Sequence, residues 1–395
     1  MSANTLTATR SDRLPLPALL ALATAVFVTS LTETLPAGVL PAMSAGLGVT
    51  ESAAGQTVTI YALGTVLTAL PLAAATAAWR RKRVLLTAMT GFAVANTVTA
   101  LSAHYVLTMT ARALAGVAAG LAWALLAGYA RRMVPAHLQG RAVALVMTGI
   151  PVALALGVPA GTFLGRLLGW RVAFGAMTVL AVLLIAWIAA LVPDQPGQRA
   201  GTRPPLLGAL RVPGVAAVLT VTLVFVLAHT ILYTYVATFL DHAGMGGSTG
   251  AVLLVFGAAS LLSIWFVGAH IDRRLRTLTI VSVLLFAVAA TLLAATSGDP
   301  AVVYAAVTLW GLGWGGAPTL LQTAVNDAGG DQADAAQAML VTLWNLAMAA
   351  GGVTGGLLLD AAGPASFPWA VLALLAPVAA LVAASRTHGF PPARR

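Results

Sequence analysis

The chain has 395 residues, of which 59% are hydrophobic and only 8% are charged, and its mean hydropathy is +0.93. In a water-soluble domain, roughly a quarter of the residues are charged, so this composition excludes a soluble protein. It indicates that most of the chain faces lipid or other apolar protein. The formal net charge is +10 and there is no cysteine, which excludes a disulfide framework, a thiolate metal site and a cysteine nucleophile.

Twelve apolar runs are each about long enough for a transmembrane helix, with charged, polar or Gly/Pro-rich breaks between them. They cover residues 15–43, 54–78, 84–102, 106–129, 142–166, 172–192, 213–240, 249–270, 277–297, 301–325, 337–360 and 368–385. Runs of this length disfavour a β-barrel, whose strands need only about ten residues. The first run resembles a secretory signal but is too long for one, so we expect an uncleaved first span. The sequence predicts an all-α polytopic membrane protein.

The positions of the basic residues give a topology. Eighteen of the 21 Lys and Arg residues fall in alternate inter-span segments: Arg10, Arg13, Arg80, Arg81, Lys82, Arg83, Arg131, Arg132, Arg141, Arg199, Arg203, Arg211, Arg273, Arg274, Arg276, Arg386, Arg394 and Arg395. By the positive-inside rule, we expect an inner or plasma membrane protein with both termini in the cytoplasm. This placement explains the net charge without a nucleic-acid partner.

The spans divide into two sets of six around a Pro/Gly-rich segment at 193–212, which is typical of a linker. At one offset of 195 residues, Gly116 and Gly120 match Gly311 and Gly315. At the same offset, Gly157, Val158 and Gly161 match Gly352, Val353 and Gly356. Residues 73–77, before the first basic loop, fall on residues 268–272 at the same offset. We therefore predict two pseudo-symmetric six-helix bundles, 1–192 and 213–395, as in a secondary transporter with its site between them. A membrane scaffold or enzyme with accidental symmetry is the alternative.

Glu33 is the only acidic residue within a predicted span of the first half. An ionisable group in the hydrocarbon layer is costly and is a functional candidate by default. Because burial disfavours the charged form of a carboxyl group, Glu33 is our candidate for binding and releasing a proton. In the alternative interpretation it lies near the outer interface and only pairs, or caps a helix break at Pro36.

Arg112 is the only basic residue deep within a span. Because arginine stays charged, it needs an anion, backbone carbonyls or a water-filled cavity. Gly116 and Gly120 follow at four-residue spacing, which permits close helix packing. A role for Arg112 in proton coupling and a purely structural tie to carbonyl groups both remain open.

Polar and aromatic side chains are scattered along the other spans, and together they could line a cavity for an amphipathic molecule. The set is Gln56, Tyr61, Asn96, Trp123, Thr148, His229, Tyr233, Tyr235, Trp310, Trp314, Gln322, Trp344 and Asn345. His229, Tyr233 and Tyr235 form the densest cluster. For any one of them, an interhelical hydrogen bond or an interfacial aromatic is the plainer explanation.

Glycine and proline mark the fifth span as a helix that bends and packs closely against a neighbour. Its residues are Gly149, Gly157, Pro159, Gly161 and Gly165. There is no phosphate-binding loop for ATP, no cluster with metal-ligand spacing and no nucleophile elbow. We therefore expect no cofactor, no metal and no enzyme activity.

These motifs resemble the major facilitator superfamily, and within it the twelve-span drug:proton antiporters that include arabinose-efflux-like and chloramphenicol-resistance-like exporters. Arg112-x-x-x-Gly116-x-x-x-Gly120 is similar to that family's fourth-span motif, and residues 149–165 are similar to its antiporter motif in span five. Residues 33–41, 229–235 and 310–322 look like spans one, seven and ten of the arabinose-efflux-like branch. The resemblance implies the major facilitator fold. It also implies that Arg112 takes part in proton transfer.

One loop departs from the family pattern. After span two, the usual G-x-x-x-D-R-x-G-R-R is reduced to the basic end Arg81-Lys82-Arg83. The second half keeps Gly268, Asp272 and Arg273, so we expect the charge contact that closes the cytoplasmic side to depend on Asp272 alone.

The sequence thus predicts a proton-coupled exporter that moves a small amphipathic compound, such as a drug or antibiotic, by alternating access. An exporter of sugars, nucleosides or an endogenous metabolite is the alternative. The expected partners are the substrate, protons and the lipid bilayer, and nothing in the pattern requires more than a monomer.

Overall fold

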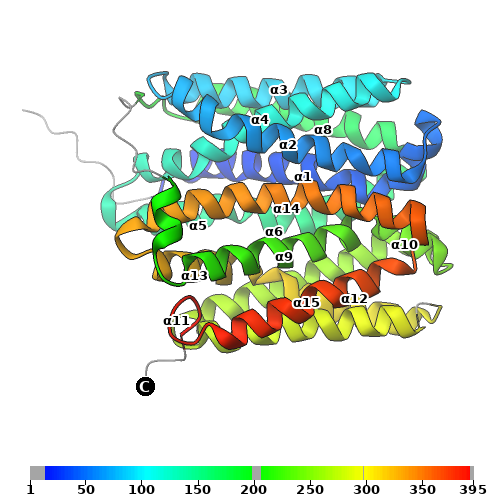
Figure 1. Ribbon diagram of the computed structural model, residues 1–395. Coiled ribbons are helices and arrows are strands. Elements are labelled where there is room, and N and C mark those ends of the chain that lie inside the picture. The colour runs from blue at the N-terminus through cyan, green and yellow to red at the C-terminus, as the bar shows by residue number, and fades with distance from the viewer. Residues whose placement is uncertain (1–13, 198–205, 297, 392–395) are drawn as a thin grey trace, which may run out of the picture.

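The computed structural model describes residues 14–197, 206–296 and 298–391, and these residues form helices joined by turns (Figure 1). The first half contains α1 (Leu16–Leu47), α2 (Glu51–Ala75), α3 (Arg81–Leu101), α4 (Tyr105–Arg132), η1 (Ala136–Leu138), α5 (Gln139–Met147), α6 (Gly149–Val152), η2 (Ala153–Gly157), α7 (Val158–Leu168) and α8 (Trp170–Leu191). The second contains η3 (Leu206–Arg211), α9 (Val215–Thr234), α10 (Val236–His242), η4 (Gly246–Ser248), α11 (Thr249–Thr296), α12 (Pro300–Gly315), α13 (Ala317–Gly329), η5 (Gly330–Gln332), α14 (Ala333–Ala362) and α15 (Ser366–Ala384).

Ten helical stretches of the described residues are long and apolar enough to cross a membrane. Two of them hold two crossings each, because one crossing needs only about 20 residues. Gly246–Ala295 has 50 residues and is interrupted by the non-helical backbone of Arg274. Pro300–Ala362 has 63 residues and is broken at Gly330, where φ is +49°. All twelve predicted spans are therefore found as helices, and the all-α fold is confirmed.

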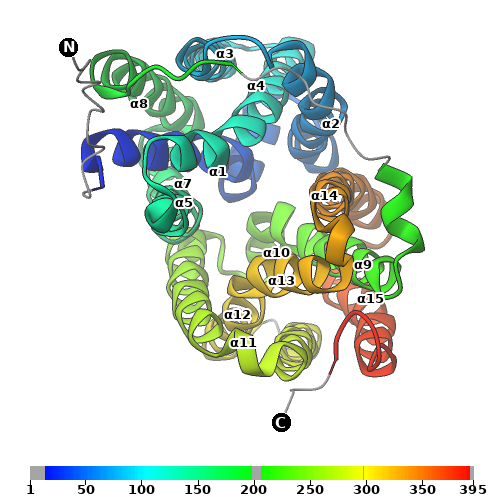
Figure 2. The ribbon, with the colours of Figure 1, turned by 90° about the vertical axis from the view of Figure 1, so that its left-hand side faces the viewer.

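The long helix α11 reverses direction at Arg274. A methyl group added to Gly311 of α12 would meet the carbonyl oxygen of Phe256, and one added to Gly313 would meet that of Ser282. Residues on both sides of Arg274 therefore lie at the same level of α12, and Figure 2 shows the two arms of α11 end-on. The predicted spans 249–270 and 277–297 are these two arms.

The internal repeat extends to atomic contacts. In the first half, Thr65 Oγ1 donates to the carbonyl of Gly116 at 3.1 Å; in the second, Ser260 Oγ donates to the carbonyl of Gly311 at 3.3 Å. Both residues of each pair differ by the same 195 positions. The matching glycines also allow the same close approach, since an added Cβ would lie 2.1 Å from the oxygen of Tyr61 and 2.5 Å from that of Phe256. The packing therefore supports the pseudo-symmetry.

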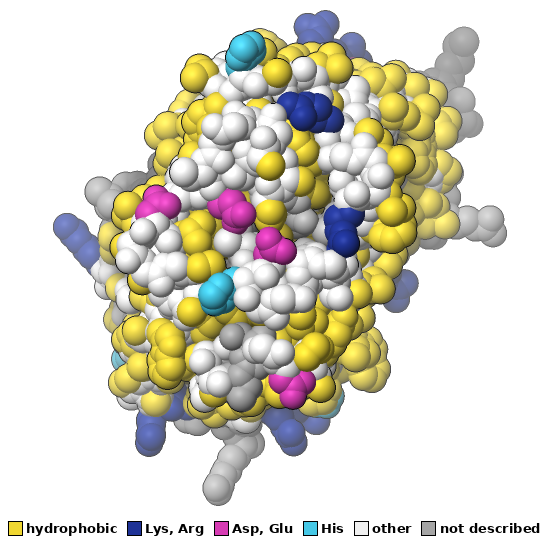
Figure 3. Space-filling view, turned by 90° about the vertical axis from the view of Figure 1, so that its right-hand side faces the viewer, with side chains coloured by type: hydrophobic (Ala, Val, Ile, Leu, Met, Phe, Trp, Pro, Cys, Tyr) yellow, Lys and Arg dark blue, Asp and Glu magenta, His cyan; other side chains and the backbone are white. Residues whose placement is uncertain are grey.

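The two ends of the helix bundle differ in charge. The basic end carries the arginine-rich turns and the start of α1 and end of α15 (Figure 2). The opposite end, which we call the acidic end, has turns that carry Glu51, Asp241, Asp299 and Asp360, and Figure 3 shows acidic side chains gathered there. The predicted basic residues Arg10, Arg13, Arg199, Arg203, Arg394 and Arg395 lie outside the described residues, as does the middle of the predicted linker, so the division at 193–212 stays a prediction.

Large apolar side chains remain exposed on the sides of the bundle. Leu101 is 79% exposed, Val106 75% and Trp265 75%. In water such a surface would aggregate, whereas in a bilayer it faces hydrocarbon while the helices satisfy their own backbone hydrogen bonds. The described chain is therefore built to be surrounded by lipid.

Two helices are irregular where proline or glycine occurs. In α1, Val39 leaves the helical region between Pro36 and Pro41. The fifth span contains a π-helical turn, η2, between α6 and α7; the bend expected for this span stays a prediction. Proline removes a backbone donor and π-turns often mark functional sites.

Candidate functional site: a charged pair facing an aromatic cluster

Glu33 and Arg112, on α1 and α4, are brought together inside the first half. Both are buried, and the guanidinium of Arg112 is close enough to the carboxyl group of Glu33 for an electrostatic interaction. Its Cζ lies 5.0 Å from the ring centre of Tyr61 and 5.9 Å from that of Phe174, within cation–π range. Arg112 Nε donates to the carbonyl of Thr57 at 3.4 Å. Carbonyl, rings and carboxyl group together hold the buried cation.

Arg112 is nevertheless incompletely bonded. Its Nη1 and Nη2 atoms are buried and have no hydrogen-bond partner among the described residues. A buried charged group with unsatisfied donors is costly, so these donors favour a carboxylate, an anion or water moving toward them. The arrangement therefore allows the charge of Glu33 to bias the local structure.

Asn96 and Tyr61 support this pair from neighbouring helices. Asn96 Nδ2 donates to Thr32 Oγ1 at 3.2 Å, next to Glu33 in the chain, and Tyr61 Oη donates to the carbonyl of Thr29 at 3.1 Å. Both side chains are fully buried in the first half. Their contacts are interhelical hydrogen bonds that fix α1 against α2 and α3.

The second half holds an aromatic cluster on four helices. We define it as Phe225, His229 and Tyr233 on α9, Phe256 and Phe286 on α11, Trp310 and Trp314 on α12, and Trp344 on α14. The His229 ring stacks flat on Trp314, with ring centres 3.4 Å apart and planes 2° apart. Trp310 Nε1 donates to His229 Nδ1 at 3.2 Å. Every side chain of the cluster carries an aromatic ring, and the Trp310–His229 bond is a hydrogen bond between two of its members.

Tyr233 connects the two groups. Its ring stacks on His229 with centres 5.1 Å apart, while its hydroxyl interacts electrostatically with Glu33 of the other half. The hydroxyl is buried and has no hydrogen-bond partner within the described residues. The acidic group and the aromatic cluster thus face each other across the interface between the halves.

Hydrogen bonds join the two halves at the acidic end. Gln56 Nε2 donates to the carbonyl of Gly352 at 3.3 Å and to Tyr235 Oη at 3.5 Å. Thr238 donates to the carboxylate of Glu51, and Arg166 Nη1 donates to the carbonyl of Gly246 at 3.0 Å. We call these cross-half bonds the acidic-end contact. The structure places Gln56 and Tyr235 here and not beside His229.

The glycines of the fifth span lie against α1. A methyl group added to Gly149 would meet the carbonyl of Ala23, and one added to Gly165 would meet Val39. Gly157 and Gly161 face Phe27 and Leu35 in the same way, and Pro159 is buried beside them. α1 therefore carries Glu33 on a helix that the fifth span holds closely.

The remaining predicted site residues are spread out. Trp123 is half-buried on α4 and Gln322 is exposed on α13. Asn345 donates to the carbonyl of Val341 of its own helix at 3.0 Å. At the basic end, Gly268, Asp272 and Arg273 are exposed.

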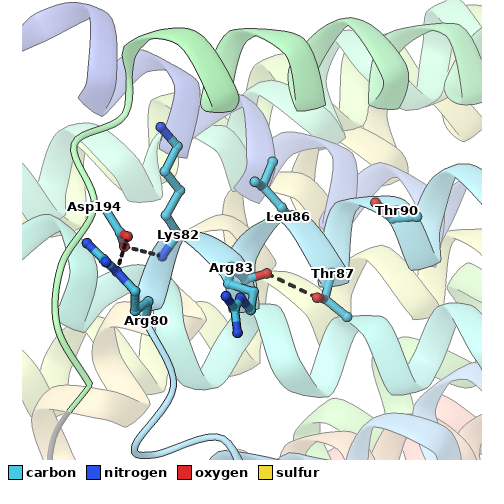
Figure 4. A pocket seen from close by; sticks show the side chains of 7 residues that line it. All are labelled: Arg80, Lys82, Arg83, Leu86, Thr87, Thr90 and Asp194. Atoms are coloured by element: carbon cyan, nitrogen blue, oxygen red, sulfur yellow. Dashed lines mark hydrogen bonds and ion pairs between the residues drawn. The ribbon is translucent and has the colours of Figure 1, made fainter.

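Sequence reasoning missed the acid that accompanies the shortened basic loop. Asp194, just after α8, forms a 2.5 Å ion pair with Arg80 and accepts from the backbone nitrogen of Lys82 at 3.3 Å (Figure 4). Lys82 Nζ also donates to the carbonyl of Ala189. The sequence did contain a signal for this ion pair: Asp194 comes directly after a span, and the basic loop at 80–83 has no acidic residue of its own.

The phenylalanines of the aromatic cluster were also missed. Phe225, His229 and Tyr233 follow at four-residue spacing, as do Trp310 and Trp314, and this spacing places side chains on one helix face. The described residues include no group of His, Cys, Asp and Glu that could hold a metal ion.

Comparison with known proteins gives the family. A model of the Major Facilitator Superfamily matches residues 22–352. The chain is 33% identical over 353 residues to "Transcription regulatory protein OpdE" of Pseudomonas aeruginosa, with 87% of each chain aligned. It is 30% identical over 366 residues to "Purine ribonucleoside efflux pump NepI" of Salmonella paratyphi C, with 91% of each aligned.

A solved structure shares the fold. A variant of the nucleoside transporter NupG superposes with a TM-score of 0.76 over 93% of this chain and 98% of that one, at 13% identity. At that identity the likeness shows the fold alone. With a family match over most of the chain, this multi-pass membrane protein is a transporter and not an enzyme, and it belongs to the Major Facilitator Superfamily.

Proposed function

We propose that this transporter exports a small amphipathic compound from the cytoplasm in exchange for protons. The observation that carries the proposal is the buried Glu33 beside the partly unsatisfied Arg112, because an ionisable pair inside the membrane is expensive and needs a function to be retained. Exchange then needs no ATP-binding segment.

The proton and the cargo bind alternately at the interface between the halves. With Glu33 ionised, its carboxylate is attracted to the free donors of Arg112; a proton arriving from the acidic end neutralises it and releases that attraction. The proton leaves toward the basic end after the halves have rocked. The cargo moves in the opposite direction, so the proton gradient drives export of the cargo.

The halves exchange access by breaking and remaking the acidic-end contact. In this structure the contact is formed, which supports a state closed at the acidic end. We place the basic end in the cytoplasm of a cell membrane because arginine-rich turns stay on that side. The two bundles, 1–192 and 213–395, move as units about the linker 193–212, and a monomer suffices.

The cargo class we favour is a purine nucleoside. The relatives that are 30% identical over 91% of their length are named purine ribonucleoside efflux pumps. The aromatic cluster gathers rings of the kind that stack on a flat base, as His229 and Trp314 stack on each other. A drug-like amphipathic compound is the second candidate, because ring faces also accept other flat apolar molecules.

A retention screen tests the proposal. The protein is expressed in a bacterial strain that lacks its own exporters, and labelled purine nucleosides, sugars and antibiotics are added with or without an uncoupler. We expect purine nucleosides to accumulate less than in cells without the protein, and the uncoupler to abolish the difference. Export that the uncoupler leaves unchanged would refute proton coupling, and export restricted to sugars would refute the favoured cargo.

A further inference from the structure

The hydrogen bond between Trp310 and His229 fixes the state of the histidine ring. An indole nitrogen only donates, so His229 Nδ1 must accept and carries no proton. The neutral ring therefore has its proton on Nε2. Protonation of Nδ1 would break the bond, which makes His229 a hydrogen-bond donor and not a proton carrier.

The rings around His229 hold it in one orientation. It stacks flat on Trp314, and the rings of Tyr233 and Phe256 lie with centres 5.1 Å and 6.1 Å away. With Nδ1 held by Trp310 on the adjacent helix, the ring cannot flip without losing that bond. The direction of the Nε2–H group is thus preset.

Two polar groups in this apolar setting have no partner in the described part of the chain. The hydroxyl of Tyr233 is buried and unpaired among the described residues. The His229 ring, one helical turn away on α9, forms its hydrogen bond through Nδ1, which leaves Nε2 without one in the same part of the chain. An unmade hydrogen bond in a buried site costs about 1–3 kcal/mol. Groups left unpaired in this way are suited to a ligand that supplies the missing partners.

We propose that His229 and Tyr233 recognise the polar edge of a flat heteroaromatic cargo. The Nε2–H group donates to a ring nitrogen or a carbonyl oxygen, the Tyr233 hydroxyl bonds to a second polar atom on that edge, and the neighbouring rings contact the cargo's faces. Trp310 is a positioning residue that acts through His229. The inference rests on the proposed function, because it names the feature of the cargo that the same site reads.

A spectroscopic experiment tests the positioning role without transport. Protein labelled with nitrogen-15 histidine is studied by NMR in lipid nanodiscs at pH 7.5, and the His229 signal among the six histidines is assigned with His229→Phe. We expect a single Nε2–H tautomer in the wild type and a mixture of both tautomers in Trp310→Phe. Trp265→Phe, on a lipid-exposed side chain, is the control that leaves the tautomer unchanged. A tautomer mixture in the wild type would overturn the inference.

A binding experiment tests recognition with two probes. Inosine carries polar atoms on its ring edge, while phenyl riboside has the same sugar and a ring without them. We expect Tyr233→Phe and His229→Phe each to weaken inosine binding about tenfold, consistent with a lost hydrogen bond to a buried polar group, and to change phenyl riboside binding less than about twofold. Tyr304→Phe, on a half-buried tyrosine outside the cluster, is the matched control.

The outcomes separate this inference from the proposed function. Equal losses for both probes would indicate a general packing defect and overturn recognition of the edge, and so would unchanged inosine binding in both variants. A wild-type protein that binds no inosine but exports another compound in an uncoupler-sensitive way would overturn the inference while the exporter function stands. Edge recognition without uncoupler-sensitive export would overturn proton coupling and leave the inference in place.

Discussion

The Arg112 side chain bonds to the backbone and also lies close to a second ionisable group. Its planar guanidinium lies within cation–π range of the Tyr61 and Phe174 rings and reaches the Thr57 carbonyl through Nε, while Nη1 and Nη2 have no hydrogen-bond partner among the described residues. Sequence alone left a structural tie and a role in coupling equally open. The structure shows both kinds of contact, because the carbonyl bond and the proximity to Glu33 occur together.

Replacing Arg112 by lysine keeps the charge but removes the planar group. A lysine ammonium is a compact point charge on a flexible chain and cannot reproduce the fork that spans rings and carbonyl. We expect Arg112→Lys to lower uncoupler-sensitive export by about tenfold or more while the amount of protein in the membrane is unchanged. Arg141→Lys, on an exposed arginine at the basic end, is the control. Full activity in Arg112→Lys would show that only the charge matters.

At the scale of helices, the internal repeat predicted from glycine positions is also present in the side-chain hydrogen bonds between helices. The Thr65–Gly116 and Ser260–Gly311 hydrogen bonds are equivalent in the two halves. Span number and type were predictable because a membrane helix has one dominant signal, its apolar length. The tight reversal of α11 at Arg274 and the π-turn of η2 were not, because they depend on packing that no periodicity encodes.

The close approach of α2 and α4 makes a stability prediction. A methyl group on Gly116 would lie 2.1 Å from the carbonyl oxygen of Tyr61, so Gly116→Ala should force the helices apart at a cost of about 1–3 kcal/mol. The thermal unfolding temperature in detergent should fall. Gly311→Ala should have a similar effect in the second half.

Gly175→Ala supplies the control for this prediction. An added Cβ at Gly175 of α8 meets nothing within 4 Å, and alanine favours a helix over glycine by about 0.5–1 kcal/mol. We therefore expect Gly175→Ala to leave the unfolding temperature unchanged or to raise it. Equal behaviour of Gly116→Ala and Gly175→Ala would contradict the packing argument.

For the whole molecule, the sequence predicted that polar residues of many spans line one cavity, and the structure assigns them to different places. Gln56 and Tyr235 lie in the acidic-end contact, Asn96 is buried within the first half, and His229 and Trp310 lie in the aromatic cluster. A single sequence shows which spans are polar but not which helix faces meet. Their roles in transport stay predictions.

The acidic-end contact predicts a shift between conformations. Gln56→Ala with Arg166→Ala removes three cross-half hydrogen bonds, so the open form of this end should become more populated. Because the chain has no cysteine, spin labels can be placed at Thr50→Cys and Asp360→Cys without other changes. We expect the labelled pair to show a larger fraction of long distances in the double variant. An unchanged distance distribution would mean that these bonds do not hold the end closed.

The central claim is that Glu33 carries the exchanged proton, and vesicles that contain only this protein test it most directly. The cargo identified by the retention screen is applied as a gradient, and a trapped dye reports the internal pH. We predict cargo-driven proton movement in the wild type and in the control Asp299→Asn, an exposed acid. In Glu33→Gln we predict none, while the exchange of labelled for unlabelled cargo continues. Proton movement in Glu33→Gln at the wild-type rate would contradict the account.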